Sequence, residues 1–145
     1  MSSSKQEKIE EIRTAAESDL VTFIKLIAPQ TILGAIHVEA CDWWTRQEAK
    51  SHQLLLFPRD HQKSRLMGYR VAWYITKHPE HRVLYISSTA NLAEKQLKFI
   101  KDILTNKIYK RYWPGMINES IDKREKWTNS EISVDHPKRI EEGVR

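Results

Sequence analysis

The most constraining feature of this sequence is a short apolar run that leads into a polar loop and then into a helix start. Residues 53–57 read Gln-Leu-Leu-Leu-Phe, and Pro58 ends the run. A short continuous apolar run between polar residues indicates a strand buried on both faces, as in a parallel sheet. A second run of this kind, Arg-Val-Leu-Tyr-Ile-Ser, occupies residues 82–87. The two runs therefore predict neighbouring strands of one sheet.

Helical patterns alternate with these runs. Apolar residues recur at helical spacing over residues 63–76 and 92–109, and residues 132–134 form a weaker third strand candidate. The order strand, helix, strand, helix forces a parallel sheet with covering helices. Residues 5–27 and 37–49 also predict helices, and Pro29 ends the first of them. The sequence thus predicts an α/β fold over residues 51–145, preceded by a helical lead over residues 1–50.

Composition narrows the class of protein. The chain has 145 residues, which suits one domain, and its net charge of +5 permits contact with a polyanion. Its longest apolar run, residues 54–57, is far shorter than the roughly 18 residues that a membrane span needs, so we expect no membrane segment. Cys41 is the only cysteine, which excludes an internal disulfide and favours a reducing compartment.

The loop after the first run carries the residues with the clearest chemistry. It reads Arg59-Asp60-His61-Gln62-Lys63-Ser64, and Lys63 and Ser64 open the predicted helix. Amides at a helix N-terminus point towards a bound anion, and the helix dipole adds about half a positive charge there. A lysine can reach the outer phosphates of a nucleotide, and a serine hydroxyl can take one position around Mg²⁺. This order of elements is that of a phosphate-binding loop.

The loop departs from the usual pattern G-x-x-x-x-G-K-[ST]. Phe57 and Gln62 stand where that pattern has glycine, and a side chain at Gln62 narrows the loop if its φ must be positive. On the residues alone, two interpretations stay open. One is a phosphate-binding loop, and the other is a surface loop whose lysine is solvated.

The loop string LLLFPRDHQKSR resembles the variant phosphate loop of phage terminase large subunits, the motors that package viral DNA. The string RVLYISSTANLAEKQLKFIKDIL resembles the next strand and helix of that family, and Trp127 to Val134 resembles its tryptophan and short strand. The resemblance runs from about His37 to the end of the chain. It implies an incomplete P-loop NTPase (ASCE-type) domain with ATP and Mg²⁺ as cofactors.

Site roles follow from this resemblance position by position. Lys63 would contact the β- and γ-phosphates, Ser64 would ligate Mg²⁺, and the amides of Asp60, His61 and Gln62 would line the phosphate cradle. Arg59 matches the loop arginine of the family, which acts on the γ-phosphate as an arginine finger in cis. The alternative for Arg59 is a salt bridge to Asp60 or another acid.

Phosphoryl transfer also needs an acid for the metal and a group that orients water. The family carries an aspartate-glutamate pair at the end of a later apolar strand, and no such pair follows Val134 here. The nuclease domain of the family is absent too. We therefore expect nucleotide binding without efficient hydrolysis, from the front part of an ATPase that is active when intact.

The resemblance also implies partners and a place of action. These are double-stranded phage DNA, a portal protein, a small terminase subunit and a homo-oligomeric ring, at the portal vertex of the procapsid in the host cytoplasm. Lys95, Lys98 and Lys101 recur on one side of the predicted helix 92–109 and could follow a DNA backbone, although a solvated helix face is the commoner meaning of such spacing. Two other interpretations stay open: a helicase-like ATPase fragment, and a non-catalytic basic DNA-binding or assembly module.

Overall fold

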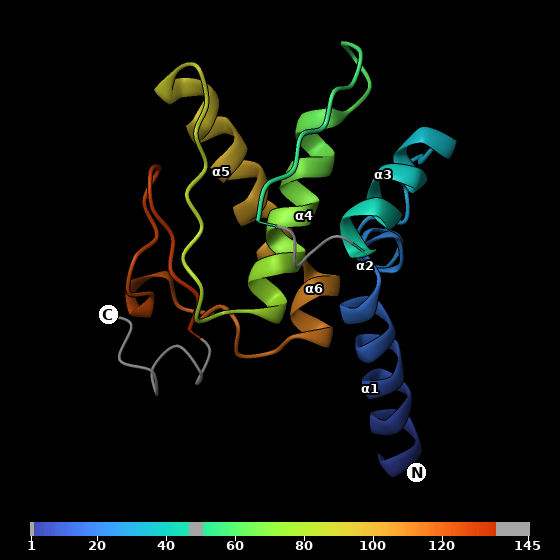
Figure 1. The fold of residues 1–145 in the computed structure, drawn as a ribbon. Coiled ribbons are helices and arrows are strands. Elements are labelled where there is room, and N and C mark those ends of the chain that lie inside the picture. Colours follow the sequence, from blue (N-terminus) through green and yellow to red (C-terminus); the bar gives the residue numbers. More distant parts are fainter. Residues whose placement is uncertain (1, 47–50, 136–145) are drawn as a thin grey trace.

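A computed structural model describes residues 2–46 and 51–135 of the chain. The described part is built from helices that pack side by side, with long extended segments between them (Figure 1). The elements are α1 (Ser2–Ser18), α2 (Leu20–Ile27), α3 (Ala35–Arg46), α4 (Lys63–Lys77), α5 (Ala90–Leu104), α6 (Lys107–Tyr112) and the short 3-10 helix η1 (Ile121–Lys123).

The predicted helix over residues 5–27 is in fact two helices. Asp19 has extended backbone angles, and its carboxylate accepts hydrogen bonds from the backbone N–H of Thr22 at 2.8 Å and from the Thr22 hydroxyl at 2.6 Å. An aspartate in this position caps a new helix, so the chain changes direction there. The single predicted helix was wrong because apolar spacing alone does not register a cap.

The core lies where α2, α4, α5 and α6 meet. Trp73 and Tyr109 are almost fully buried there, and both keep a hydrogen-bond partner. The Trp73 indole N–H donates to the Ala16 carbonyl at 3.0 Å, and the Tyr109 hydroxyl lies 2.8 Å from the Thr76 hydroxyl. Buried aromatic groups with satisfied polar atoms combine a large apolar area with a fixed orientation, so they join the N-terminal helices to α4 and α6.

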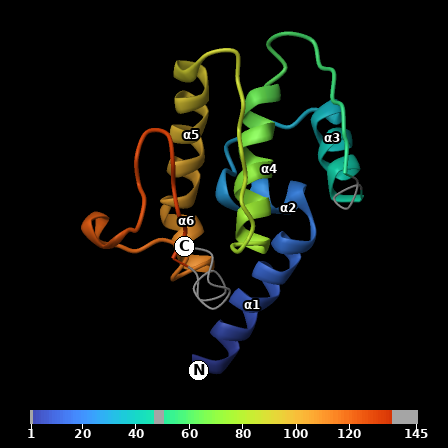
Figure 2. The same cartoon turned by 60° about the vertical axis from the view of Figure 1, so that its left-hand side comes forward.

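The helices α4 and α5 pack against each other and lie side by side in Figure 2. Gly68 makes this approach possible, since a Cβ atom there would lie 2.5 Å from Cδ1 of Phe99. The Phe99 ring packs edge-on against Tyr69, with ring centroids 5.3 Å apart. A glycine at this position thus lets an aromatic ring lie directly on the α4 backbone.

The predicted parallel sheet is wrong. Residues 53–58 and 82–87 are extended, as expected, but the described residues form no sheet, and their one β-bridge joins Trp127 and Ile132. In the described part of the chain, no backbone hydrogen bond links one extended segment to the other. An α/β P-loop fold therefore does not describe this structure, and the predicted third strand at residues 132–134 is reduced to one side of that bridge.

The physical reason lies in the pattern of burial. Leu55, Phe57 and Tyr85 lie partly buried, whereas Leu54 and Leu84 are 77% and 83% exposed. Residues 53–57 thus pack one side on the core and turn the other side to solvent, whereas residues 82–86 are mostly exposed. A continuous apolar run indicates an extended backbone that could be buried on both sides, but it does not supply the partner strands.

The helix predicted over residues 92–109 is also divided. The helix α5 ends at Leu104, and the Asn106 side chain caps α6 by accepting from the N–H of Ile108 at 2.7 Å. The helix predicted over residues 63–76 is confirmed, since α4 begins at Lys63. No helix in the described part is both long and apolar enough to cross a lipid bilayer.

Candidate phosphate-binding loop

The loop that precedes α4 has an unusual backbone. Asp60 and Gln62 both have positive φ values, of 62° and 53°. Left-handed backbone is uncommon for residues other than glycine, although aspartate adopts it more readily than most. The sequence indicates that a side chain at Gln62 narrows the loop if its φ is positive, and the φ of Gln62 is positive.

The start of α4 differs from three other helix starts. Asp19, Thr89 and Asn106 each use a side-chain oxygen to accept a hydrogen bond from the first turn of their helix. Gln62, the residue that precedes α4, makes no such bond. In the part of the chain that the structure describes, no side chain accepts from the first amides of α4. Free amides at a helix N-terminus, together with the helix dipole, favour an anion.

Two side chains from other helices position the loop. His37 of α3 accepts from the Gly34 N–H through Nδ1 at 2.9 Å, so its Nε2 carries the proton and donates to the His61 carbonyl at 3.1 Å. Gln96 of α5 donates to the Ser64 carbonyl. The His61 ring turns back on the loop, because its Nδ1 lies 2.7 Å from the Arg59 carbonyl. The left-handed backbone is thus supported from both sides.

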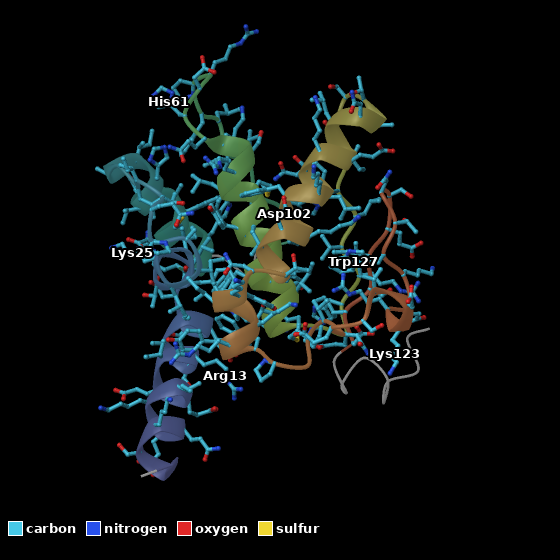
Figure 3. All side chains as sticks on the ribbon, turned by 180° about the vertical axis from the view of Figure 1, so that it is seen from behind. Arg13, Lys25, His61, Asp102, Lys123 and Trp127 are labelled. Carbon is cyan, nitrogen blue, oxygen red and sulfur yellow. The ribbon has the colours of Figure 1, made fainter. Side chains whose placement is uncertain are left out.

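The predicted site residues lie together at one end of the molecule. Figure 3 shows His61 at the tip of the loop, beyond the start of α4. The side chains of Arg59, Lys63 and Ser64 are exposed, and Gln62 is partly buried. Among the described residues, Arg59 makes no salt bridge. The loop therefore presents its cations to solvent.

The loop residues do not line either of two hollows in the surface of the described part. A cleft of about 690 Å³ lies between residues 82–85, α5 and residues 129–134. A shallower hollow of about 590 Å³ lies over α5 and Trp127. An anion at the start of α4 would consequently be held by backbone amides and exposed cations, with little apolar enclosure.

The three predicted lysines of α5 fall at the shallower hollow. Lys95 and Lys98 are exposed, and Lys101 is partly buried with its Nζ 5.6 Å from the centre of the Trp127 ring. Arg124 lies over the same ring at 4.4 Å. The sequence did not indicate this pairing, because Trp127 and Arg124 lie in an irregular segment whose position relative to α5 no local pattern encodes. Glu94 and Asp102 line the same hollow, so its positive charge is partly balanced.

Perturbed ionisation occurs away from the loop. Burial raises the pKa of the Cys41 thiol to about 12, with smaller contributions from the nearby carboxylates of Asp42 and Asp19. Burial likewise raises the pKa of Tyr109. Both groups belong to the core, so these shifts reflect packing and carry no catalytic meaning.

The loop itself carries Asp60 and His61, but the described side chains whose donor atoms converge lie elsewhere. Within the described residues, the one group of three histidine, cysteine or acidic side chains whose donor atoms converge is His78, Glu80 and His81, past the far end of α4. Mg²⁺ at Ser64 would therefore depend on the serine hydroxyl, phosphate oxygens and water. Mg²⁺ commonly binds in this way, because it gives up its waters reluctantly.

In the described part of the chain, the loop thus combines two residues of positive φ, first amides of α4 that no side chain caps, and the exposed cations Arg59 and Lys63. Comparisons of this chain with models of protein families, with curated proteins and with solved structures gave no match.

Proposed function

We propose that residues 59–64 bind the phosphates of ATP, and that the chain is the ATP-binding part of a viral DNA-packaging terminase large subunit. One observation carries the proposal. A left-handed residue, Gln62, stands directly before Lys63 and Ser64, at a helix start whose amides are capped by none of the described side chains. The resemblance of the loop string to that family adds the nucleotide and the biological role.

The roles of the individual groups follow from their chemistry. The first amides of α4 donate to phosphate oxygens, and the ammonium of Lys63 neutralises the charge of the outer phosphates. The Ser64 hydroxyl would supply one oxygen ligand to a Mg²⁺ ion bound with the nucleotide, and that ion would neutralise phosphate charge. Arg59 lies before the cradle, where its guanidinium would meet the γ-phosphate. In the intact motor, hydrolysis of that ATP would drive double-stranded DNA through a portal into the procapsid, with a small terminase subunit and a ring of copies as partners.

The test measures nucleotide binding by the chain itself. A fluorescent ATP analogue is titrated with Mg²⁺ present, and ATP, ADP and AMP are used as competitors. We expect ATP and ADP to compete better than AMP, because the loop recognises phosphates. We also expect little phosphate release.

Matched variants separate a specific site from general attraction to a basic protein. Lys63→Ala should weaken binding at least tenfold, since a lysine contact to a phosphate is a charge-assisted bond worth about 1.5–3 kcal/mol. The control is Lys107→Ala, which removes an exposed lysine at the start of α6, where Asn106 already caps the helix. Equal losses in the two variants, or no nucleotide binding by the unmodified protein, would refute the proposal.

We also propose that the exposed face of α5 contacts DNA. The supporting observation is that Lys95 and Lys98 are exposed beside Lys101 and Arg124, which both lie over Trp127. A double Lys95→Ala, Lys98→Ala variant should bind duplex DNA more weakly, and its affinity should depend less steeply on salt. The matched control removes Lys5 and Lys8 from α1, two exposed lysines at the same spacing. An equal effect of both double variants would indicate attraction to net charge alone.

A further inference from the structure

A tight turn at the end of α4 gathers three metal-binding side chains. The helix ends at Lys77, and the N–H of His78 donates to the Tyr74 carbonyl. The N–H of His81 then donates to the His78 carbonyl at 3.0 Å, which closes a four-residue turn with Pro79 in its second position. Proline fixes φ at this position of a turn, so the side chains on either side of it are held with little freedom.

The donor atoms of the three side chains converge. His78 Nδ1 and His81 Nε2 each lie 3.8 Å from the same oxygen, Oε1 of Glu80. One donor atom from each residue lies within 4.8 Å of the others, and the two imidazole rings stack with centroids 4.9 Å apart. Donors bound to one tetrahedral Zn²⁺ lie about 3.3 Å apart, given bonds of about 2.0–2.1 Å. Small side-chain rotations would therefore close the cluster on an ion.

A tyrosine from the last turn of α4 orients one of the ligands. The Tyr74 hydroxyl lies 2.7 Å from Nδ1 of His81, on the opposite side of the ring from the Nε2 atom that faces Glu80. When Nδ1 carries the proton and donates to this hydroxyl, Nε2 presents its lone pair to a metal. Histidine ligands in metal sites commonly donate their other ring N–H to a nearby acceptor in this way.

The surroundings of the turn suit a cation and leave it accessible. The turn follows the C-terminus of α4, where the helix dipole places partial negative charge. The side chains of His78, Glu80 and His81 are 35%, 18% and 49% exposed, so an ion can enter from solvent. Glu80 and His81 also line the cleft of about 690 Å³, which leaves space for water on the ion.

We propose that His78, Glu80 and His81 bind one divalent transition metal ion, with Zn²⁺ as the probe and water completing its coordination. Two imidazoles and one carboxylate bind such ions in preference to Mg²⁺ or Ca²⁺, because Mg²⁺ and Ca²⁺ prefer oxygen donors. The site is separate from the phosphate-binding loop. The 15 residues of α4 place the two about 22 Å apart, at 1.5 Å per residue.

The experiment titrates metal-free protein with ZnCl₂ in a calorimeter, in competition with a chelator of known affinity. We expect one ion per chain. Alanine variants of His78 and His81 should each lose binding at least tenfold, and Tyr74→Phe should lose between ten- and a hundredfold, as is typical when the outer partner of a histidine ligand is removed. The control is His52→Ala, which removes an exposed histidine outside the cluster and should bind as the unmodified protein does.

Two further measurements separate a metal site from a structural turn. Circular dichroism of the variants without metal should match the unmodified protein, so that lost binding is not lost folding. X-ray absorption at the zinc edge should show two imidazole ligands. Retained zinc affinity in either histidine variant, or equal loss in His52→Ala, would overturn the proposal. Lys63→Ala should keep zinc binding and His81→Ala should keep nucleotide binding, so each of the two proposals can be refuted without the other.

Discussion

The substitution Gly68→Ala adds one methyl group between α4 and α5 and should show how tightly the two helices pack. A Cβ atom there would lie 2.5 Å and 2.7 Å from two carbons of Phe99 and 2.8 Å from Nε2 of Gln96. Overpacking of this kind costs about 1–3 kcal/mol, and displacing Phe99 would also weaken its edge contact with Tyr69, worth about 0.5–1.5 kcal/mol. Alanine gains about 1 kcal/mol over glycine within a helix, which offsets part of this loss. Gly68→Ala should therefore lower the free energy of unfolding by about 1–3 kcal/mol.

The assay is urea unfolding followed by tryptophan fluorescence, with Gly68→Ala, Phe99→Ala and the double variant measured together. If the clash with Phe99 causes the loss, removing that ring should relieve it, and the double-mutant cycle should give a coupling of about 1 kcal/mol or more. A Gly68→Ala protein as stable as the unmodified one would refute the reasoning. So would an equal cost of Gly68→Ala with and without the Phe99 ring.

Three further changes test other features. Gln62→Gly should raise the free energy of unfolding by about 1 kcal/mol, because glycine adopts the observed φ of 53° without strain, and urea unfolding measures this. Cys41 is neutral when protonated, and its folded pKa of about 12 exceeds the ordinary value of 9.0. The folded state therefore holds the proton more tightly, so stability should fall as pH rises from 9 towards 12, and the fall should be shallower in Cys41→Ala. Leu84→Lys should change the free energy of unfolding by less than about 0.5 kcal/mol, because this side chain is 83% exposed, and urea unfolding measures this. A larger change would contradict the last of these predictions.

The sequence predicted the helices better than it predicted what joins them. Residues 63–76 were recognised because the apolar spacing and the Lys-Ser start agree, and the structure places α4 at Lys63–Lys77. The breaks at Asp19 and Asn106 were missed because a capping side chain competes with helix continuation through one or two hydrogen bonds. The predicted sheet failed for a different reason. The continuous apolar run at residues 53–57 predicts extended backbone, which the structure has, but strand pairing depends on distant residues.

The candidate loop, too, could be predicted from the sequence only in part. Its residues are contiguous, so the sequence could name Arg59, Lys63 and Ser64 without knowing the fold. The hydrogen bonds that support the loop come from His37, 24 residues from His61, and from Gln96, 32 residues from Ser64. Nothing in the sequence near His37 or Gln96 indicates these contacts. The His78, Glu80 and His81 cluster has no spacing typical of a metal site in the sequence, because a turn at Pro79 brings the donor atoms together.

The helix α1 extends away from the body of the protein, and only its last turns reach the core (Figure 1). Ala16 is buried and accepts from Trp73, and Glu17 accepts from the Trp113 indole at 2.8 Å, whereas residues 4–8 are exposed. An isolated helix of this length is marginal in water, so the outer turns are stable only as an extension of the anchored end. Amide hydrogen exchange along α1 should consequently slow by orders of magnitude from its first turn to its last, and α1 should open from its free end without unfolding of the core.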